Sequence, residues 1–326
     1  MKCTSKLKKK SRLLCLLCIA ALFVGGCKST IENAYDPYST DFMNGYNGVD
    51  YFASNSCVTN DVNFGDTANS SVAEGAGVFN MDTKEVKFNK NIFERLYPAS
   101  TTKVLTAYII LKRCNMSDIV TVSKEAANPA ESSSVCGLKE GDQISVMELL
   151  YGLLLESGND AAIALAEHCS GSVEAFADLM NQTAAKLGAT QSNFVNPSGY
   201  PDENHYTTIY DMYLIFSNAI SLESFVTIIN SAAHDAAYTN ASGNAVNVKF
   251  SNTCGYLSGA YEAPEGVNVV GGKTGTTHDA GYCLVLYSTN SDNERIISIV
   301  YKADGKSNLY PVSYTHLRAH ETGAYL

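Results

Sequence analysis

The stretch Leu96–Leu105, which reads LYPASTTKVL, is the part of the sequence on which the predicted fold and function depend. In it Ser100 and Lys103 lie three residues apart, just before an apolar run that is typical of a buried helix. Residues three apart share one face of a helix, so the hydroxyl and the amine are predicted to meet at the helix N-terminus. Backbone N–H groups there favour developing negative charge, as a nucleophile with a neighbouring base requires.

The spacing of these two residues does not identify a catalytic site by itself. Ser5 and Lys8 are also three residues apart, in a basic segment at the start of the chain that cannot be catalytic. A serine that caps a helix beside a solvated lysine explains the pattern without any chemistry. The interpretation therefore depends on motifs elsewhere in the sequence.

The N-terminus has the three parts of an export signal. Six basic residues lie within the first twelve, an apolar segment spans Leu13–Val24, and small residues precede Cys27. The apolar segment is too short to cross a bilayer comfortably. Residues 24–27, VGGC, resemble the lipobox of bacterial lipoproteins. We therefore expect residues 1–26 to be removed and Cys27 to carry a lipid that anchors the protein to a membrane outside the cytoplasm. An ordinary signal peptide with an incidental cysteine is the alternative.

Removal of residues 1–26 leaves a strongly acidic chain. Six basic residues are lost, so 17 basic residues remain against 33 acidic ones, a formal net charge of −16 (17 − 33). Such a surface argues against nucleic acid as a partner. Six further cysteines could pair in several ways in an oxidising compartment; they are Cys57, Cys114, Cys136, Cys169, Cys254 and Cys283. These six contain no C-x-x-C pair, so a zinc site has no support and no cofactor is predicted.

Composition divides the rest of the chain into three parts. Residues 27–68 are rich in Asn, Asp, Ser, Gly and Tyr without a sustained period, which predicts a flexible tether. The folded domain is expected over residues 69–310. Residues 311–326 change composition abruptly and resemble translated sequencing-adapter read-through, so we expect that they are not native and that the natural domain continues beyond Tyr310.

The periodicity of apolar residues predicts strands at both ends of the domain and helices between them. A first pair of strands alternates around the turn DTKE at residues 82–85. Further strands are predicted at Ile119–Val122, Val246–Phe250, Val267–Gly271, Tyr282–Tyr287 and Ile296–Tyr301. Beside the helix after Ser100, helices are predicted at Val146–Leu155, Ala161–Cys169, Val173–Leu187, Thr207–Ile220 and Leu222–Ile229. This order is typical of an α/β (α+β) fold with a helical subdomain, and the continuous apolar strands indicate a sheet covered on both faces.

Two further motifs follow the Ser100 stretch. Ser157-Gly158-Asn159 falls at the predicted break between two helices, and Lys273-Thr274-Gly275 ends a predicted buried strand. Ser-x-Asn recurs three times in the sequence, but only the copy at Ser157 lies on a turn between helices. Lys-Thr-Gly occurs once.

The three motifs in this order resemble those of the penicillin-recognising serine enzymes, and specifically the low-molecular-mass penicillin-binding proteins that are D-alanyl-D-alanine carboxypeptidases. The resemblance covers about Ser71–Lys302 and includes the flanking sequences YPASTTK, LLESGNDAAIALAEH, FVNPSG and GGKTGTTHDAGYCL. It implies a β-lactamase/transpeptidase-like fold, with a mainly antiparallel sheet flanked by helices and a helical subdomain.

The resemblance also implies the catalytic roles. Ser100 would attack the carbonyl between the two terminal D-alanines of a peptidoglycan stem peptide, and β-lactams would acylate the same hydroxyl. Lys103 would be the base, and a lysine serves as a base only when its charged form is disfavoured. Burial and a second cation such as Lys273 would both achieve this. Ser157 would pass the proton to the leaving amine.

The remaining motif residues would bind the substrate. The N–H groups of Ser100 and Thr276 would hold the oxyanion, and Gly275 would let the peptide lie against the strand. Asn159 would hold the peptide amide. Lys273, Thr274 and Thr276 would bind the terminal carboxylate.

Two alternative functions stay open from the sequence. A class A-like β-lactamase needs a glutamate that activates the deacylating water, and the loop Phe194–Tyr206 offers only Glu203. A non-catalytic cell-wall-binding lipoprotein of the same fold would leave no penicillin adduct on Ser100. A Ser-His-Asp hydrolase has no support, because no G-x-S-x-G motif accompanies the histidines. Structural or exposed positions are therefore expected for His168, His205, His234 and His278, with His278 near the cleft.

Overall fold

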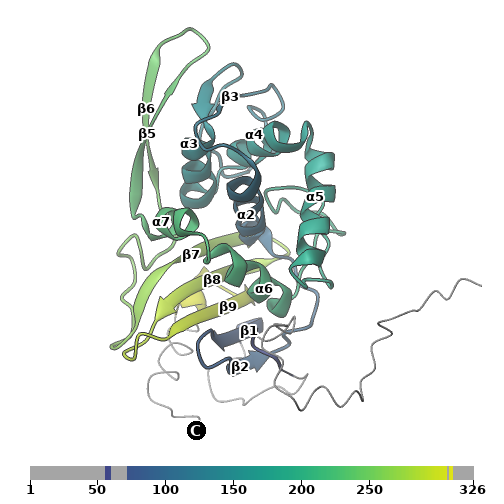
Figure 1. Ribbon diagram of the computed structural model, residues 1–326, viewed down its shortest axis with the longest axis vertical. Coiled ribbons are helices and arrows are strands. Elements are labelled where there is room, and N and C mark those ends of the chain that lie inside the picture. The colour runs from purple at the N-terminus through teal and green to yellow at the C-terminus, as the bar shows by residue number, and fades with distance from the viewer. Residues whose placement is uncertain (1–55, 60–71, 307, 311–326) are drawn as a thin grey trace, which may run out of the picture. The chain divides into compact units, whose positions relative to one another are not determined.

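A sheet of five antiparallel strands joins the two ends of the folded domain (Figure 1). The computed structural model describes residues 56–59, 72–306 and 308–310, all within the unit Phe52–Leu326. The strands are ordered β2-β1-β9-β8-β7. Their bounds are Ala73–Asn80 for β1, Val86–Lys90 for β2, Asn268–Thr277 for β7, Gly281–Thr289 for β8 and Arg295–Ala303 for β9. Strands were predicted at both ends of the domain, and the structure pairs β1 with β9.

The predicted leader and tail cannot be compared with the structure. Residues 1–26, Cys27 and residues 311–326 lie outside the described residues, as does most of the tether. Removal of the leader, lipidation of Cys27 and the non-native tail therefore stay predictions.

Both faces of the five-stranded sheet are covered, as the continuous apolar strands predicted. Successive side chains of a strand point to opposite faces. In β8, Cys283 and Val285 belong to the main core with the helices. Leu284 and Leu286 belong to a second cluster on the other face, which Cys254 and Tyr310 help to cover. A strand between two cores needs apolar residues at every position, which explains its unbroken apolar sequence.

The helices form a layer on one side of this sheet and a subdomain beyond it (Figure 1). Their bounds are Lys103–Arg113 for α2, Val146–Tyr151 for α3, Asn159–Ser170 for α4, Val173–Lys186 for α5, Ile209–Ala219 for α6 and Glu223–Asn230 for α7. Within the described ranges no single helix is long and apolar enough to cross a membrane, and only α6 and α7 reach that length together, as a pair bent by 105°. Helix α2 runs through the core, with Val104, Leu105 and Ala107 fully buried.

A second, smaller sheet was only partly predicted. Its order is β3-β4-β5-β6, with bounds Ile119–Thr121, Gln143–Ser145, Ala233–Thr239 and Ala245–Ser251. The prediction missed β4 and β5. Strand β4 has three residues, and β5 reads AHDAAYT, so neither has the run of large apolar side chains that marks a strand.

Two element boundaries also differ from the prediction. The helix predicted to end at Leu155 ends as α3 at Tyr151, and a π-helical turn η4, Gly152–Glu156, follows it. Strand β7 extends beyond the predicted bound Gly271 to Thr277, and it includes the Lys-Thr-Gly motif that was predicted to end a strand. The glycines and threonines in this part of the strand have no apolar pattern, so pairing with β8 stabilises its extended conformation.

Candidate active site

Ser100 lies in a strained turn rather than in the first turn of an α-helix. The 3-10 turn η3, Ala99–Thr102, precedes α2. Ala99 has a φ of +47°, in the left-handed region that costs a residue with a side chain about 1 to 2 kcal/mol. Ser100 follows it and is half-buried, while Thr101 donates a hydrogen bond to the Pro98 carbonyl at 2.8 Å. The turn therefore holds the hydroxyl of Ser100 at the edge of the core.

Lys103 is placed to act on this hydroxyl. It is fully buried, and its Nζ lies 3.0 Å from Ser100 Oγ, 2.7 Å from Asn159 Oδ1 and 2.7 Å from the Ser198 carbonyl oxygen. Burial holds the pKa of Lys103 well below its usual value, and the positive charge of Lys273 lowers it further. A neutral amine has two N–H groups for the two carbonyl oxygens and one lone pair for the hydroxyl of Ser100. Lys103 thus has the surroundings of a general base.

Lys273 forms a second buried network. It lies on β7, is 1% exposed, and donates to Ser157 Oγ at 3.0 Å and to the Thr274 carbonyl at 2.9 Å. Burial lowers the pKa of Lys273 to about 7. Burial and the charge of Lys273 both disfavour the charged form of Lys103, whereas burial is the main effect on Lys273. The two buried lysines therefore favour an arrangement in which they share a single positive charge.

The junction between η4 and α4 positions Ser157 and Asn159. Ser157 has a φ of +63°, and Asn159 is the first residue of α4. Strained residues and π-helical turns persist where the surroundings impose them, often at functional sites. Asp160 supplies that constraint, because its carboxylate accepts N–H groups of residues 136, 137 and 138 at 2.9 to 3.1 Å. Asp160 was not predicted as a site residue, although it belongs to the quoted sequence SGND.

The strand β7 passes directly beside the Ser100 turn. A Cβ on Gly275 would lie 2.9 Å from the Ser100 nitrogen and 3.0 Å from the Pro98 carbonyl oxygen, so a side chain cannot be accommodated there. Thr274 Oγ1 lies 2.8 Å from Thr253 Oγ1. Strand β7 is an edge strand of the sheet, so its edge away from β8 is not paired with another strand of that sheet.

The loop after Phe194 supplies contacts that the sequence analysis did not assign. Besides the Ser198 carbonyl, it contains Asn196, whose Oδ1 accepts the N–H groups of Ser198, Gly199 and Tyr200 at 3.1, 2.8 and 3.1 Å. Gly199 has a φ of +79°, and a Cβ there would lie 1.8 Å from the Ala99 carbonyl oxygen. The sequence FVNPSG was part of the family resemblance, but the sequence analysis assigned no role to its residues.

Replacement of Gly199 tests how tightly this loop holds the Ser100 turn. We expect Gly199→Ala to lower the free energy of unfolding by about 3 kcal/mol, because backbone strain and a clash with Ala99 add together. Gly243→Ala is the matched control, since Gly243 has a φ of +82° with no atom within 4 Å of the added Cβ. Strain alone should cost the control about 1 to 2 kcal/mol. The free energies of unfolding are measured by chemical denaturation. Equal losses for the two variants would show that the contact between Gly199 and Ala99 adds no cost.

The buried histidine of this loop is structural, as expected. His205 accepts the Val195 N–H at Nδ1 at 3.2 Å, so its Nε2 carries the proton and donates to Thr102 Oγ1 at 2.8 Å. Burial lowers the pKa of His205 to about 4, so the ring is neutral at physiological pH. His168 and His234 lie against the carboxylates of Asp118 and Glu148.

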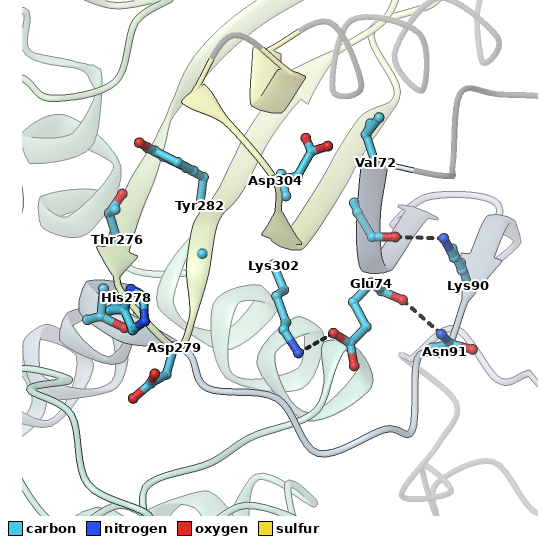
Figure 2. A pocket seen from close by; sticks show the side chains of 14 residues that line it. Val72, Glu74, Lys90, Asn91, Thr276, His278, Asp279, Tyr282, Lys302 and Asp304 are labelled. Carbon is cyan, nitrogen blue, oxygen red and sulfur yellow. Dashed lines mark hydrogen bonds and ion pairs between the residues drawn. The ribbon is translucent and has the colours of Figure 1, made fainter.

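A cavity of about 780 Å³ begins at Thr276 and extends along the ends of the strands. Figure 2 shows Thr276, His278 and Asp279 on one side of it, with the ion pair between Lys302 and Glu74 facing them. His278 therefore lines a hollow next to the motif strand. In the part of the chain that the structure describes, no three His, Cys, Asp or Glu side chains are grouped to hold a metal.

The structure thus brings the motif residues into two adjoining hydrogen-bonded groups. One contains Ser100, Lys103 and Asn159, and the other contains Ser157, Lys273 and Thr274. Gly275 lies against the Ser100 nitrogen, and Thr276 lines the adjacent cavity. The expected lipid attachment residue Cys27 lies outside the described residues.

Comparison with known proteins agrees with this geometry. The family model of peptidase family S11, described as D-alanyl-D-alanine carboxypeptidase, matches residues 63–305. The chain is 35% identical over 236 residues to the D-alanyl-D-alanine carboxypeptidase DacF of Bacillus subtilis, a match that covers 71% of this chain and 57% of DacF. It is 38% identical over 222 residues to the D-alanyl-D-alanine carboxypeptidase DacC of Escherichia coli, which covers 65% of this chain and 52% of DacC. The chain therefore spans little more than half the length of these relatives.

The fold also agrees with solved structures. The crystal structure of the Streptomyces K15 DD-transpeptidase superposes with a TM-score of 0.69 at 28% sequence identity, covering 80% of this chain and all of that one. The predicted fold, an antiparallel sheet flanked by helices as in the penicillin-binding DD-peptidases, is confirmed. By the extent of the family match and by its fold, the chain belongs to the D-alanyl-D-alanine carboxypeptidase family of serine peptidases.

Proposed function

We propose that this chain is a serine-type D-Ala-D-Ala carboxypeptidase, which trims peptidoglycan stem peptides through an acyl-enzyme on Ser100 and is acylated there by β-lactams. One observation carries the proposal. The Nζ of Lys103, a fully buried lysine with a strongly lowered pKa, lies 3.0 Å from Ser100 Oγ. Membership of the family and the 2.7 Å contact of Lys103 with Asn159 support it.

The acylation step follows from the surroundings of Ser100. Neutral Lys103 takes the hydroxyl proton while Oγ attacks the carbonyl carbon between the two terminal D-alanines. The N–H groups of Ser100 and Thr276 hold the oxyanion, each contributing about 3 to 4 kcal/mol. The close approach of Gly275 to the Ser100 nitrogen supports this assignment, because it brings the backbones of β7 and the turn together.

The second network serves the leaving group and the substrate carboxylate. Ser157, hydrogen-bonded to Lys273, passes the proton to the departing amine of D-alanine. Lys273, Thr274 and Thr276 bind the terminal carboxylate, which explains a preference for the C-terminal residue. Asn159 holds the peptide amide. Water then attacks the acyl-enzyme, with Lys103 again as the base, and releases the shortened peptide.

The substrate also implies where the protein acts. Peptidoglycan is outside the cytoplasm of bacteria, and the basic and apolar N-terminal segment predicts export. We propose that a lipid on Cys27 anchors the protein to the membrane. The mass of the mature N-terminal peptide tests this proposal, and an unmodified Cys27 in protein isolated from membranes would refute it.

Mass spectrometry of the full chain after penicillin and after a peptide ending in D-Ala-D-Ala tests the proposed activity. The expected results are one lasting penicilloyl adduct, on the hydroxyl of Ser100, and the release of free D-alanine.

 The peptide that carries the adduct is expected to be Leu96–Lys103, which contains Ser100 and which trypsin releases after Arg95. Rapid hydrolysis of penicillin with no lasting adduct would indicate a β-lactamase instead. The absence of both an adduct and D-alanine release would indicate a non-catalytic protein.

The pH dependence of acylation is expected to be bell-shaped. Lys103 acts as a base only when neutral, so the second-order rate constant rises with pH as this lysine loses its proton. Lys273 binds a carboxylate only when charged, so the rate constant falls as pH passes about 7, the pKa of Lys273. Arginine keeps its charge throughout this range, so Lys273→Arg should lose the falling limb. The test is the rate of acylation by penicillin between about pH 5 and 9, and a falling limb that persists in Lys273→Arg would exclude this assignment.

A further inference from the structure

Cys114 and Cys169 lie against each other at one end of the helical subdomain. Cys114 directly follows α2, and Cys169 lies in the last turn of α4. Their side chains share a hydrogen bond. The same two segments meet a second time close by, where His168 Nε2 lies 3.4 Å from Asp118 Oδ2. Two contacts therefore join the segments that contain the two cysteines.

The other four cysteines of the described residues occupy separate places. Cys57 donates to the Asn80 carbonyl at 3.3 Å, and Cys283 donates to the Ala280 carbonyl at 3.4 Å. Cys136 lies beside Asp160, and Cys254 belongs to the cluster on the far face of the sheet. Burial raises the pKa of all four thiols, which makes them unreactive.

The paired thiols differ from these four, because their shared hydrogen bond raises the pKa of Cys114 and lowers the pKa of Cys169. Both are only partly buried, so a small oxidant can reach them. The hydrogen bond from Cys114 lowers the pKa of Cys169 to about 6, because it stabilises the thiolate. A thiolate is the form that attacks a disulfide, so Cys169 is the expected nucleophile of the pair.

We infer that Cys114 and Cys169 form a disulfide bond once the chain meets an oxidising disulfide outside the cytoplasm, the location given under the proposed function. Cys169 thiolate attacks one sulfur of the external disulfide and expels the other sulfur as a thiolate. Cys114, as its thiolate, then attacks Cys169 Sγ and expels the second external thiolate. The two cysteines lose two protons and two electrons, and the external disulfide is reduced to two thiols.

The bond would link the two helices whose first residues, Lys103 and Asn159, contact each other in the candidate active site. Helix α2 begins at Lys103 and α4 begins at Asn159, and these residues are hydrogen-bonded at 2.7 Å. The disulfide joins the opposite ends of the same two helices and closes a loop of about 55 residues between positions 114 and 169. A loop of that length restricts the unfolded chain strongly, so the bond stabilises the folded domain.

Peptide mapping of the full chain tests the inference directly. The protein is equilibrated with oxidised glutathione, alkylated without reduction and digested with trypsin. The six cysteines fall in six different tryptic peptides, because a lysine or arginine separates each from the next. We expect the peptide that begins at Cys114 to be linked to the peptide Glu140–Lys186, which contains Cys169, and the linkage to vanish on reduction. No linkage, or linkage of either peptide to the Cys136 peptide, would overturn the inference.

Thermal unfolding supplies a second readout that does not depend on mapping. Reduction is expected to lower the Tm of the wild type by roughly 5 to 15 °C. The variants Cys114→Ala and Cys169→Ala should unfold near the temperature of the reduced wild type and show no response to reductant. A wild type whose Tm does not respond to reductant would contradict the inference. Acylation of Ser100, measured in the same samples, reports on the proposed function separately from the disulfide.

Discussion

Replacing Ser100 by alanine is expected to abolish the penicillin adduct and to reduce D-alanine release at least about a thousandfold. The reason is that the proposed reaction proceeds through a covalent bond to Oγ, and without the hydroxyl Lys103 has no group to deprotonate. The measurement is intact-protein mass spectrometry after penicillin, together with a D-alanine assay on a peptide ending in D-Ala-D-Ala. Retention of the adduct in Ser100→Ala would show that another residue is the nucleophile.

The matched control for this variant is Ser242→Ala. Ser242 begins one of the other Ser-x-Asn sequences and is exposed at the turn between β5 and β6. If penicillin reacted with any accessible serine, Ser242 would be modified more readily than half-buried Ser100. We expect the adduct and the D-alanine release of Ser242→Ala to equal those of the wild type.

Replacing Lys103 by methionine is expected to slow acylation by about 100- to 10,000-fold without preventing folding. Methionine has a similar unbranched chain but no amine, so the proton of Ser100 has no acceptor at the 3.0 Å position. Loss of the hydrogen bonds to Asn159 and Ser198 should cost stability, and removal of an amine from a fully buried site should offset part of that cost. The rate of adduct formation and the Tm are measured on the same preparation.

Lys112→Met is the control for this prediction. Lys112 lies on the same helix but is exposed, so its replacement changes the charge of α2 without entering the site. Its acylation rate should match that of the wild type. If Lys103→Met acylated as fast as Lys112→Met, a group other than Lys103 would have to be the base.

The strongly patterned parts of the fold were predictable from the sequence alone. Strands β8 and β9 are mainly apolar, as a strand between two cores requires. Helix α5 was predicted from its period and from its end before Gly188, which has a φ of +86°. Strand β5 was missed because its alanines and polar residues contain no such signal, and its partner β6 determines its conformation.

The sequence by itself determined which residues could carry the chemistry, through short motifs in a fixed order around Ser100, Ser157 and Lys273. Only the tertiary structure decided the pKa of those residues and the distances between them. Lys103 has the lowered pKa that a base requires because it is fully buried beside Lys273, a residue 170 positions away (273 − 103). Burial and contact between distant segments arise only when the whole chain folds, and they set both the pKa of Lys103 and the 3.0 Å approach of its amine to Ser100.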